Sequence, residues 1–172
     1  LLGTYPKEAP PTRDERAHYR MSPEEYHRGC RLLQTGAILL YAFPGSPTIF
    51  YGDEAGMEGY EDPFNRGTFP WGREDRMLQR RFALLGSLRS TRVSLQEGEL
   101  RWLHAQGHGL AFARELADEI TVAATNAGDD PLFLTFDWPG DLATDALTGQ
   151  QFLAVDGKIT ICLPPLDGVL LV

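Results

Sequence analysis

The stretch Ala42-Phe-Pro-Gly-Ser-Pro-Thr-Ile-Phe-Tyr-Gly-Asp-Glu54 joins two patterns that together indicate the fold class. Before it, Ser22 opens a predicted helix whose apolar residues recur every three or four positions, and Glu25 completes a capping box. Pro44-Gly45 ends that helix. The apolar run 47–51 then predicts a buried strand. A helix, a tight turn and a buried strand in succession are typical of one step in an α/β protein.

The pattern changes twice after this stretch. Residues 55–73 form a loop rich in Gly, Pro and aromatic residues, which is too long to be a simple connector. A second amphipathic helix is predicted from Glu74 to Arg92, with its apolar side chains facing inward: Met77, Leu78, Phe82, Leu85 and Leu88. After Gly98, alternating runs between turn signals predict an antiparallel sandwich with strands at 100–105, 109–114, 119–125, 132–136, 151–155, 158–163 and 168–172.

The composition restricts the classes of function. With 42% hydrophobic and 23% charged residues, the 172-residue chain has the balance of a globular protein. Its net charge of −8 argues against nucleic acid as a partner and is compatible with a neutral sugar. No apolar run approaches the roughly 18 residues that span a bilayer, so no membrane partner is expected. Cys30 and Cys162 are predicted to be two buried free thiols, and no cofactor or metal site is predicted.

The stretch 42–54 resembles the last barrel strand of the α-amylase family, glycoside hydrolase family 13. It shares the Pro-Gly-x-Pro turn, the apolar strand and the Tyr-Gly-Asp-Glu sequence. The loop 56–66, followed by Phe69-Pro70-Trp71, resembles the neopullulanase, cyclomaltodextrinase and maltogenic amylase branch. The ending 163–172 is similar to the closing strand of that family's C-terminal domain. The resemblance covers about Ser22 to Val172.

The resemblance implies an α+β fragment in three parts. Residues 1–21 are a loop or arm, residues 22–97 are the C-terminal end of a (β/α)8 catalytic barrel, and residues 98–172 are a β-sandwich C-terminal domain. A complete barrel needs about 250 residues. We therefore expect the segment before residue 98 to hold at most the seventh helix, the eighth strand and the eighth helix.

The resemblance also implies a retaining glycosidase that hydrolyses α-1,4 glucosidic bonds, with α-1,6 bonds left open. Its substrate is an α-glucan oligosaccharide or polysaccharide derived from starch. The family's catalytic carboxylates follow earlier strands, and the last of them lies in an Asn-His-Asp-like motif. None of the four histidines in this chain is followed by Asp. We predict that the catalytic residues are absent and that the fragment alone is inactive.

Substrate contacts are expected only from the long loop, because barrel active sites lie at the C-terminal ends of the strands. Asp62 and Arg66 match positions that hold a glucose unit in the resembling branch, and a carboxylate with a guanidinium suits vicinal hydroxyls. A local salt bridge that shapes the loop is an equal alternative. The aromatic residues of the loop are expected mainly to pin it to the barrel, and Trp71 is the best candidate among them for stacking on a sugar ring. Asp53 and Glu54 are adjacent and expected to point apart, so we interpret them as structural.

Other interpretations stay open at this point. One is a non-catalytic carbohydrate-binding or structural β-sandwich, which would bind glucan through exposed Trp102 or Trp138. Another is a transglycosylase or trehalose-type isomerase of the same family. The arginines of the second helix are expected to form a solvated face. Because the helix end 36–43 and the strand 47–51 match a barrel interior, we expect the isolated chain to self-associate or to fold its helices over apolar surface.

Overall fold

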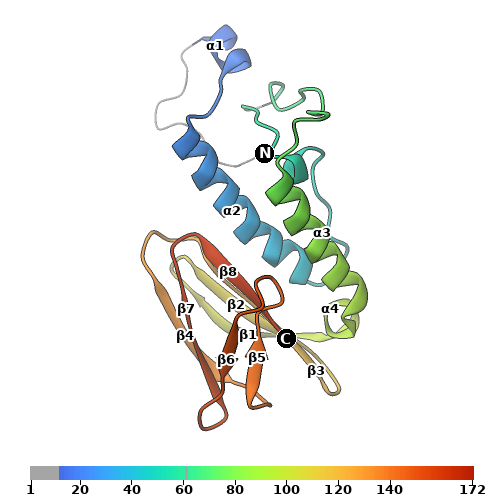
Figure 1. Ribbon diagram of the computed structural model, residues 1–172, viewed down its shortest axis with the longest axis vertical. Coiled ribbons are helices and arrows are strands. Elements are labelled where there is room, and N and C mark those ends of the chain that lie inside the picture. The colour runs from blue at the N-terminus through green and yellow to red at the C-terminus, as the bar shows by residue number, and fades with distance from the viewer. Residues whose placement is uncertain (1–11, 61) are drawn as a thin grey trace.

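The computed structural model describes residues 12–60 and 62–172 and combines helices with antiparallel strands, as predicted. The helices occupy one half of the molecule and the strands the other (Figure 1). The helices are α1 (Arg13–His18), α2 (Pro23–Ala42), the 3-10 turn η1 (Asp53–Ala55), α3 (Arg76–Thr91) and α4 (Val93–Glu97). The strands are β1 (Glu99–Gln106), β2 (Gly109–Leu116), β3 (Glu119–Asn126), β4 (Leu132–Asp137), β5 (Leu142–Thr144), β6 (Gln151–Leu153), β7 (Lys158–Leu163) and β8 (Asp167–Leu171).

The long helix α2 begins and ends where the sequence predicts. The Ser22 hydroxyl accepts from the Glu25 amide at 3.2 Å, and the Glu25 carboxylate accepts from the Ser22 amide at 2.8 Å, so the capping box is confirmed. Helix α3 begins two residues later than predicted, because the Asp75 carboxylate caps it. Met77 therefore lies on the outer face of the first turn, 77% exposed, and its predicted inward position is wrong.

The strands form a four-stranded sheet in the order β1-β2-β3-β8 and two smaller sheets, β4-β7 and β5-β6. Successive residues of β2, β3 and β8 point to opposite faces of the large sheet. One face packs against β4 and β7 and contributes Ala111, Val122 and Val169 to a core with Leu134, Phe136, Ile159 and Ile161. The other face packs against the helices and contributes Phe112, Ala123 and Leu170 to a core with Ala37, Ile38, Phe82, Leu85 and Leu95.

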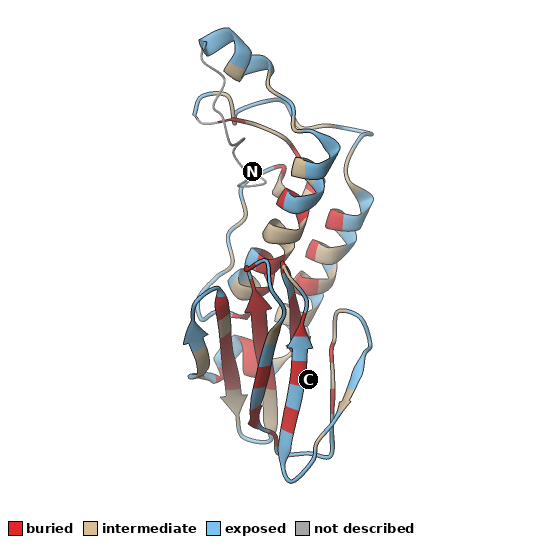
Figure 2. Cartoon of the chain, turned by 90° about the vertical axis from the view of Figure 1, so that its left-hand side faces the viewer, coloured by how far each residue is buried: buried red, intermediate tan, exposed pale blue. Residues whose placement is uncertain are grey.

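Both faces of the large sheet are thus covered, and buried residues are concentrated along its central strands and on the helix faces turned toward it (Figure 2). This arrangement has three layers: helices, four-stranded sheet, and smaller sheets. The helices do fold over an apolar sheet face, as one branch of the sequence prediction expected. Self-association of the chain stays a prediction.

A buried arginine joins the helical layer to the sheet. Arg114, on β2, is 2% exposed. Its Nη1 donates to the Ala42 carbonyl at the end of α2 (2.7 Å), and its Nε donates to the Gly98 carbonyl after α4 (3.0 Å). The last carbonyls of a helix have no intrahelical donor, so the guanidinium satisfies groups that would otherwise be buried without a partner.

Two arginines of the second helix also make structural contacts. Arg89 donates to the Phe43 carbonyl at 2.9 Å, just beyond the end of α2. Arg92 donates to the Thr121 hydroxyl of β3 at 2.8 Å. The predicted solvated arginine face is therefore wrong at these two positions, because the ends of α2 and α3 lie against neighbouring groups that accept hydrogen bonds. It is also wrong at Arg81, whose Nε donates to Gln34 Oε1 and whose Nη1 is buried.

Two other predictions about local structure are wrong. Residues 47–51 form no strand, because no described strand lies beside them to complete their backbone hydrogen bonds. Within the predicted arm, residues 1–11 lie outside the described residues, but α1 forms at 13–18 with a Thr12–Glu15 capping box. The sequence also gave no signal for α4 or β5, which are five and three residues long. No helix within the described ranges has the length and apolar character needed to cross a bilayer.

Candidate functional site

The long loop between η1 and α3 is closed at its base. The Asp75 amide donates to the Ala55 carbonyl at 2.9 Å, which joins the two ends of the loop. The Tyr26 hydroxyl of α2 donates to Asp75 Oδ2 at 3.0 Å. Gly56 has a φ of +69°, and a Cβ at that position would lie 2.2 Å from the Tyr26 hydroxyl oxygen. A side chain is therefore excluded at Gly56 by both conformation and contact.

Burial, followed by the proximity of Cys30 and the hydrogen bond to Asp75, raises the pKa of Tyr26. The raised pKa favours the protonated phenol, which is the form that donates to Asp75. Asp75 in turn accepts from the Met77 amide at 2.9 Å at the start of α3. One carboxylate therefore positions both the helix and the loop base.

Asp62 and Arg66 come together in the loop. Arg66 Nε donates to Asp62 Oδ1 at 2.7 Å, and the two side chains are 69% and 61% exposed, respectively. The local salt bridge that the sequence left open is thus present. An exposed ion pair of this kind contributes only about 0–1 kcal/mol to stability. Its position at the solvent-facing surface of the loop leaves it accessible to a ligand.

The aromatic residues of the loop differ in exposure. Trp71 is 80% exposed and lies against Phe69, with ring centroids 4.6 Å apart. Tyr60 is buried and packs edge-on against Tyr19 at 5.8 Å. The Tyr51 hydroxyl donates to the Gly67 carbonyl at 2.9 Å. Trp71 is therefore the aromatic side chain of the loop with a free ring surface, while Tyr60 anchors the loop to the segment before α2.

Asp53 and Glu54 lie in η1 rather than at the end of a strand. Glu54 Oε2 accepts from the Gly52 amide at 3.0 Å, and Gly52 has a φ of +93°. This local bond shapes the turn that leads into the loop, in line with the structural role predicted for Glu54. Asp53 has further interactions within the turn.

A cleft of about 390 Å³ at the loop base was not predicted from the sequence. Its polar lining residues come from the segment before α2 and from the loop: Arg20, Glu58, Thr68 and Arg73. Glu58 Oε2 accepts from the Met21 amide at 2.7 Å, which fixes the first segment against the loop. The lining residues Arg20 and Glu58 are far apart in the sequence, so no short motif identifies this cleft.

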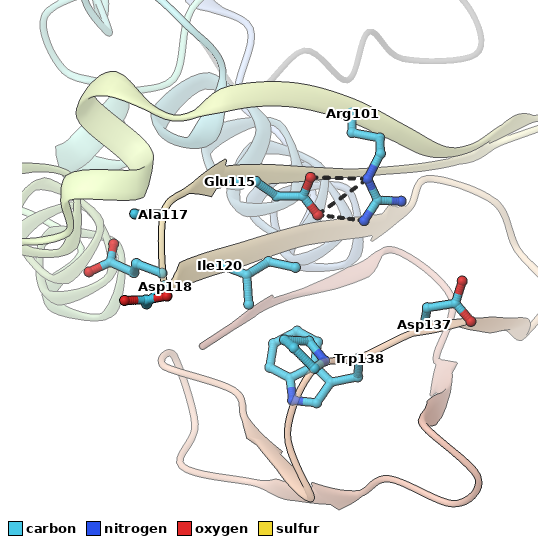
Figure 3. A pocket seen from close by; sticks show the side chains of 9 residues that line it. Arg101, Glu115, Ala117, Asp118, Ile120, Asp137 and Trp138 are labelled. Atoms are coloured by element: carbon cyan, nitrogen blue, oxygen red, sulfur yellow. Dashed lines mark hydrogen bonds and ion pairs between the residues drawn. The ribbon is translucent and has the colours of Figure 1, made fainter.

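A second cleft, of about 590 Å³, lies at one end of the strands. In Figure 3, Arg101 and Glu115 join along one side, and Trp138 lies on the other. Arg101 Nε donates to Glu115 Oε2 at 3.1 Å, and these bonds hold the pKa of Glu115 below its ordinary value. Asp137 accepts from Lys158 Nζ at 2.6 Å. These ion pairs use part of the hydrogen-bonding capacity of the charged side chains at this cleft.

The two tryptophans of the β region differ. Trp138 is 6% exposed, and its indole N–H donates to the Leu142 carbonyl at 3.0 Å. The sugar-platform alternative therefore does not hold for Trp138, because the side chain closes the core beneath the second cleft. Trp102 is 51% exposed and packs beside Phe43, with centroids 5.9 Å apart.

The thiols are both free. Cys30 is buried in α2, whereas Cys162, on the outer face of β7, is exposed, so its predicted burial is wrong. Burial raises the pKa of the Cys30 thiol. Over residues 12–60 and 62–172, no three His, Cys, Asp or Glu side chains are grouped to hold a metal ion.

Comparison with known proteins was made by sequence and by structure. The chain is 37% identical over 155 residues to an amylopullulanase of Thermoanaerobacter thermohydrosulfuricus, a match that covers 81% of this chain and 10% of that relative. It is 33% identical over 134 residues to neopullulanase 2 of Thermoactinomyces vulgaris, covering 74% and 23%. A solved α-amylase from Anoxybacillus superposes with a TM-score of 0.76 at 29% identity, covering 83% of this chain and 32% of that one. No protein-family model matches the chain.

The fold and these relatives define a class, the glycoside hydrolases of the α-amylase type. The chain belongs to the α-amylase family, glycoside hydrolase family 13, and its relatives include amylopullulanases, neopullulanase, cyclomaltodextrinase and maltogenic amylase. It spans only 10% of that amylopullulanase and 23% of that neopullulanase.

Proposed function

We propose that the chain is the C-terminal part of a glycosidase that hydrolyses α-1,4 glucosidic bonds of starch-derived glucans, with α-1,6 bonds as a second substrate class. Residues 22–97 are the end of the catalytic (β/α)8 barrel, and residues 98–172 are its C-terminal β-sandwich. The names of the relatives and the small share of their length that the chain covers support this proposal. The pair α2 and α3, separated by a turn and a long loop, supports the barrel assignment.

In this proposal the bond is cleaved by carboxylates outside the 172 residues. A retaining glycosidase forms a covalent glycosyl intermediate on one carboxylate, and a second carboxylate protonates the leaving oxygen and then activates water. The present chain contributes to substrate binding. Its loop holds a glucose unit beside the site of cleavage, and α2 and α3 support the loop from below.

The observation that carries the proposal is the exposed Asp62–Arg66 pair. One guanidinium N–H and one carboxylate oxygen are used in their mutual bond, and a guanidinium has five N–H groups in total. The pair therefore offers fixed donors and an acceptor to two neighbouring sugar hydroxyls, while the salt bridge fixes their spacing. Trp71 supplies an exposed ring surface in the same loop. The salt-bridge and sugar-binding interpretations are thus compatible.

The main alternative is a non-catalytic β domain that binds glucan or serves only as structure. The burial of Trp138 removes one of the two aromatic platforms that this alternative requires. Trp102 keeps an exposed ring and remains its one specific support. Under this alternative, glucan binding depends on Trp102 and is insensitive to changes at Asp62 and Arg66.

The test is hydrolysis of maltotriose, pullulan and cyclodextrin by the 172-residue chain and by the longer protein that contains it. We expect turnover by the longer protein alone. In that protein, Arg66→Gln should raise KM about tenfold, the equivalent of about 1.4 kcal/mol of binding. The control, Arg101→Gln, breaks an exposed ion pair in the β region and should leave KM unchanged. Turnover by the short chain, or an unchanged KM for Arg66→Gln, would refute the respective part of the proposal.

A further inference from the structure

A small cavity lies between the helical layer and the end of the sheet. It measures about 90 Å³ and is lined by residues of α2, of α3 and of the turn into β8: Arg31, Gln34, Thr35, Ile38, Arg81, Leu166, Asp167 and Gly168. Since α2 runs beside β8 (Figure 1), the cavity belongs to the contact between the two halves of the molecule. None of its lining residues belongs to the glucan-binding loop, and it takes no part in the proposed hydrolysis.

Two guanidinium groups line the cavity, and both are held in place. Arg31 Nε donates to the Leu166 carbonyl at 3.2 Å, and Arg31 Nη2 donates to the Pro165 carbonyl. Arg81 Nε donates to Gln34 Oε1 at 3.2 Å. These bonds to neutral acceptors fix the orientation of the side chains without neutralising their charge.

The positive charge at this cavity is only partly compensated, because two guanidinium groups and one carboxylate, that of Asp167, line it. Neither Arg31 nor Arg81 has an ion-pair partner among residues 12–60 and 62–172. Arg81 Nη1 is buried and has no hydrogen-bond partner in the same ranges. The lining carboxylate, Asp167, accepts from the Gly168 amide. A buried N–H without an acceptor costs roughly 1–3 kcal/mol, and more for a charged group, so the site requires an acceptor.

We propose that this cavity binds a tetrahedral inorganic oxyanion, with phosphate as the type ligand. One water molecule needs roughly 10–15 Å³ of such space, so the cavity has room for a compact ion as well as for water. Water satisfies the free N–H but leaves both positive charges in place. An oxyanion accepts from the free N–H and also neutralises positive charge, because guanidinium groups bind its oxygens through charge-assisted hydrogen bonds. The bound ion links α2 and α3 to the turn before β8.

The experiment is a phosphate titration of the 172-residue chain, followed by its thermal unfolding midpoint at constant ionic strength set with chloride. Specific binding predicts a rise that grows with the logarithm of the phosphate concentration and reaches about 3–6 °C at ten times the dissociation constant. Phosphate also stabilises proteins by exclusion from their surface, but that effect does not depend on one side chain.

The matched variants are Arg81→Gln and Arg80→Gln, which remove the same charge from adjacent positions of α3. Arg80 is exposed and does not line the cavity. We expect Arg81→Gln to lose the part of the rise that specific binding causes and Arg80→Gln to keep it. An equal rise with phosphate in the wild-type protein and in both variants overturns the proposal.

A second measurement covers the case in which Arg81→Gln does not fold. Equilibrium dialysis of wild-type protein against phosphate should show one saturable site, displaced by sulfate but not by an equal concentration of chloride. Arg81→Lys keeps the charge but lacks the planar fork of donors, and should weaken phosphate binding at least tenfold. Absence of a saturable site in the wild-type protein means that the cavity holds water only.

Discussion

Replacement of Arg114 by Met tests how the helical layer is attached to the sheet. Methionine replaces the aliphatic part of the arginine side chain, but it is shorter and donates no hydrogen bond. The carbonyls of Ala42 and Gly98 would stay buried without the two donors that they have now. Each hydrogen bond from a charged group contributes about 1.5–3 kcal/mol, so the two together contribute about 3–6 kcal/mol.

The loss is partly offset, because burial of the guanidinium carries a cost of its own. Burial, followed by the proximity of Arg89, lowers the pKa of Arg114, which shows that the charged form is disfavoured by its surroundings. Removal of this charge recovers part of the desolvation cost. We therefore expect a net loss of about 3 kcal/mol in the free energy of unfolding, which corresponds to about 6–12 °C in the unfolding midpoint.

The assay is urea unfolding followed by tryptophan fluorescence and by far-ultraviolet circular dichroism. The control is Arg101→Met, on the neighbouring strand, because Arg101 forms an exposed pair with Glu115. That variant should lose no more than about 1 kcal/mol. If Arg114→Met unfolds within about 0.5 kcal/mol of Arg101→Met, the guanidinium does not hold the two layers together and the reasoning is refuted.

Two further predictions concern the loop base and the thiols. Gly56→Ala should destabilise the protein by at least about 2 kcal/mol more than the control Gly149→Ala, as measured by thermal unfolding. Both glycines have a positive φ, but only Gly56 faces the Tyr26 hydroxyl, so equal losses would contradict the close contact. In native protein near pH 8, a thiol reagent should label Cys162 rapidly and Cys30 only on unfolding, because Cys30 is buried and its pKa is raised; two fast equivalents would show that α2 opens readily.

Much of the helical half could be predicted from local sequence. The Ser22–Glu25 capping box and the apolar period that follows it define α2, since both signals act within one helix. The alternating runs after Gly98 likewise predicted seven of the eight strands. The Asp62–Arg66 pair was recognisable for the same reason, because residues four apart in a short segment meet without help from the rest of the fold.

Strand pairing and side-chain burial could not be predicted from the sequence. The run 47–51 has the composition of a buried strand, but a strand exists only where a neighbour completes its hydrogen bonds. Trp102 and Trp138 both lie in β patterns, yet one is exposed and the other closes a core. The exposure of each ring depends on which segments pack over it, and those segments are distant in the chain.

The sequence by itself determined most of the elements, the family and the exposed pair in the loop, because each is encoded in a few adjacent residues. Only the tertiary structure decided the roles of the arginines. Arg89 and Arg114 find their acceptors 46 and 72 positions away, and Arg31 and Arg81 meet at one cavity from two helices. The local sequence around an arginine does not show whether its guanidinium faces water or an unsatisfied carbonyl. Long-range packing alone decides between these two environments.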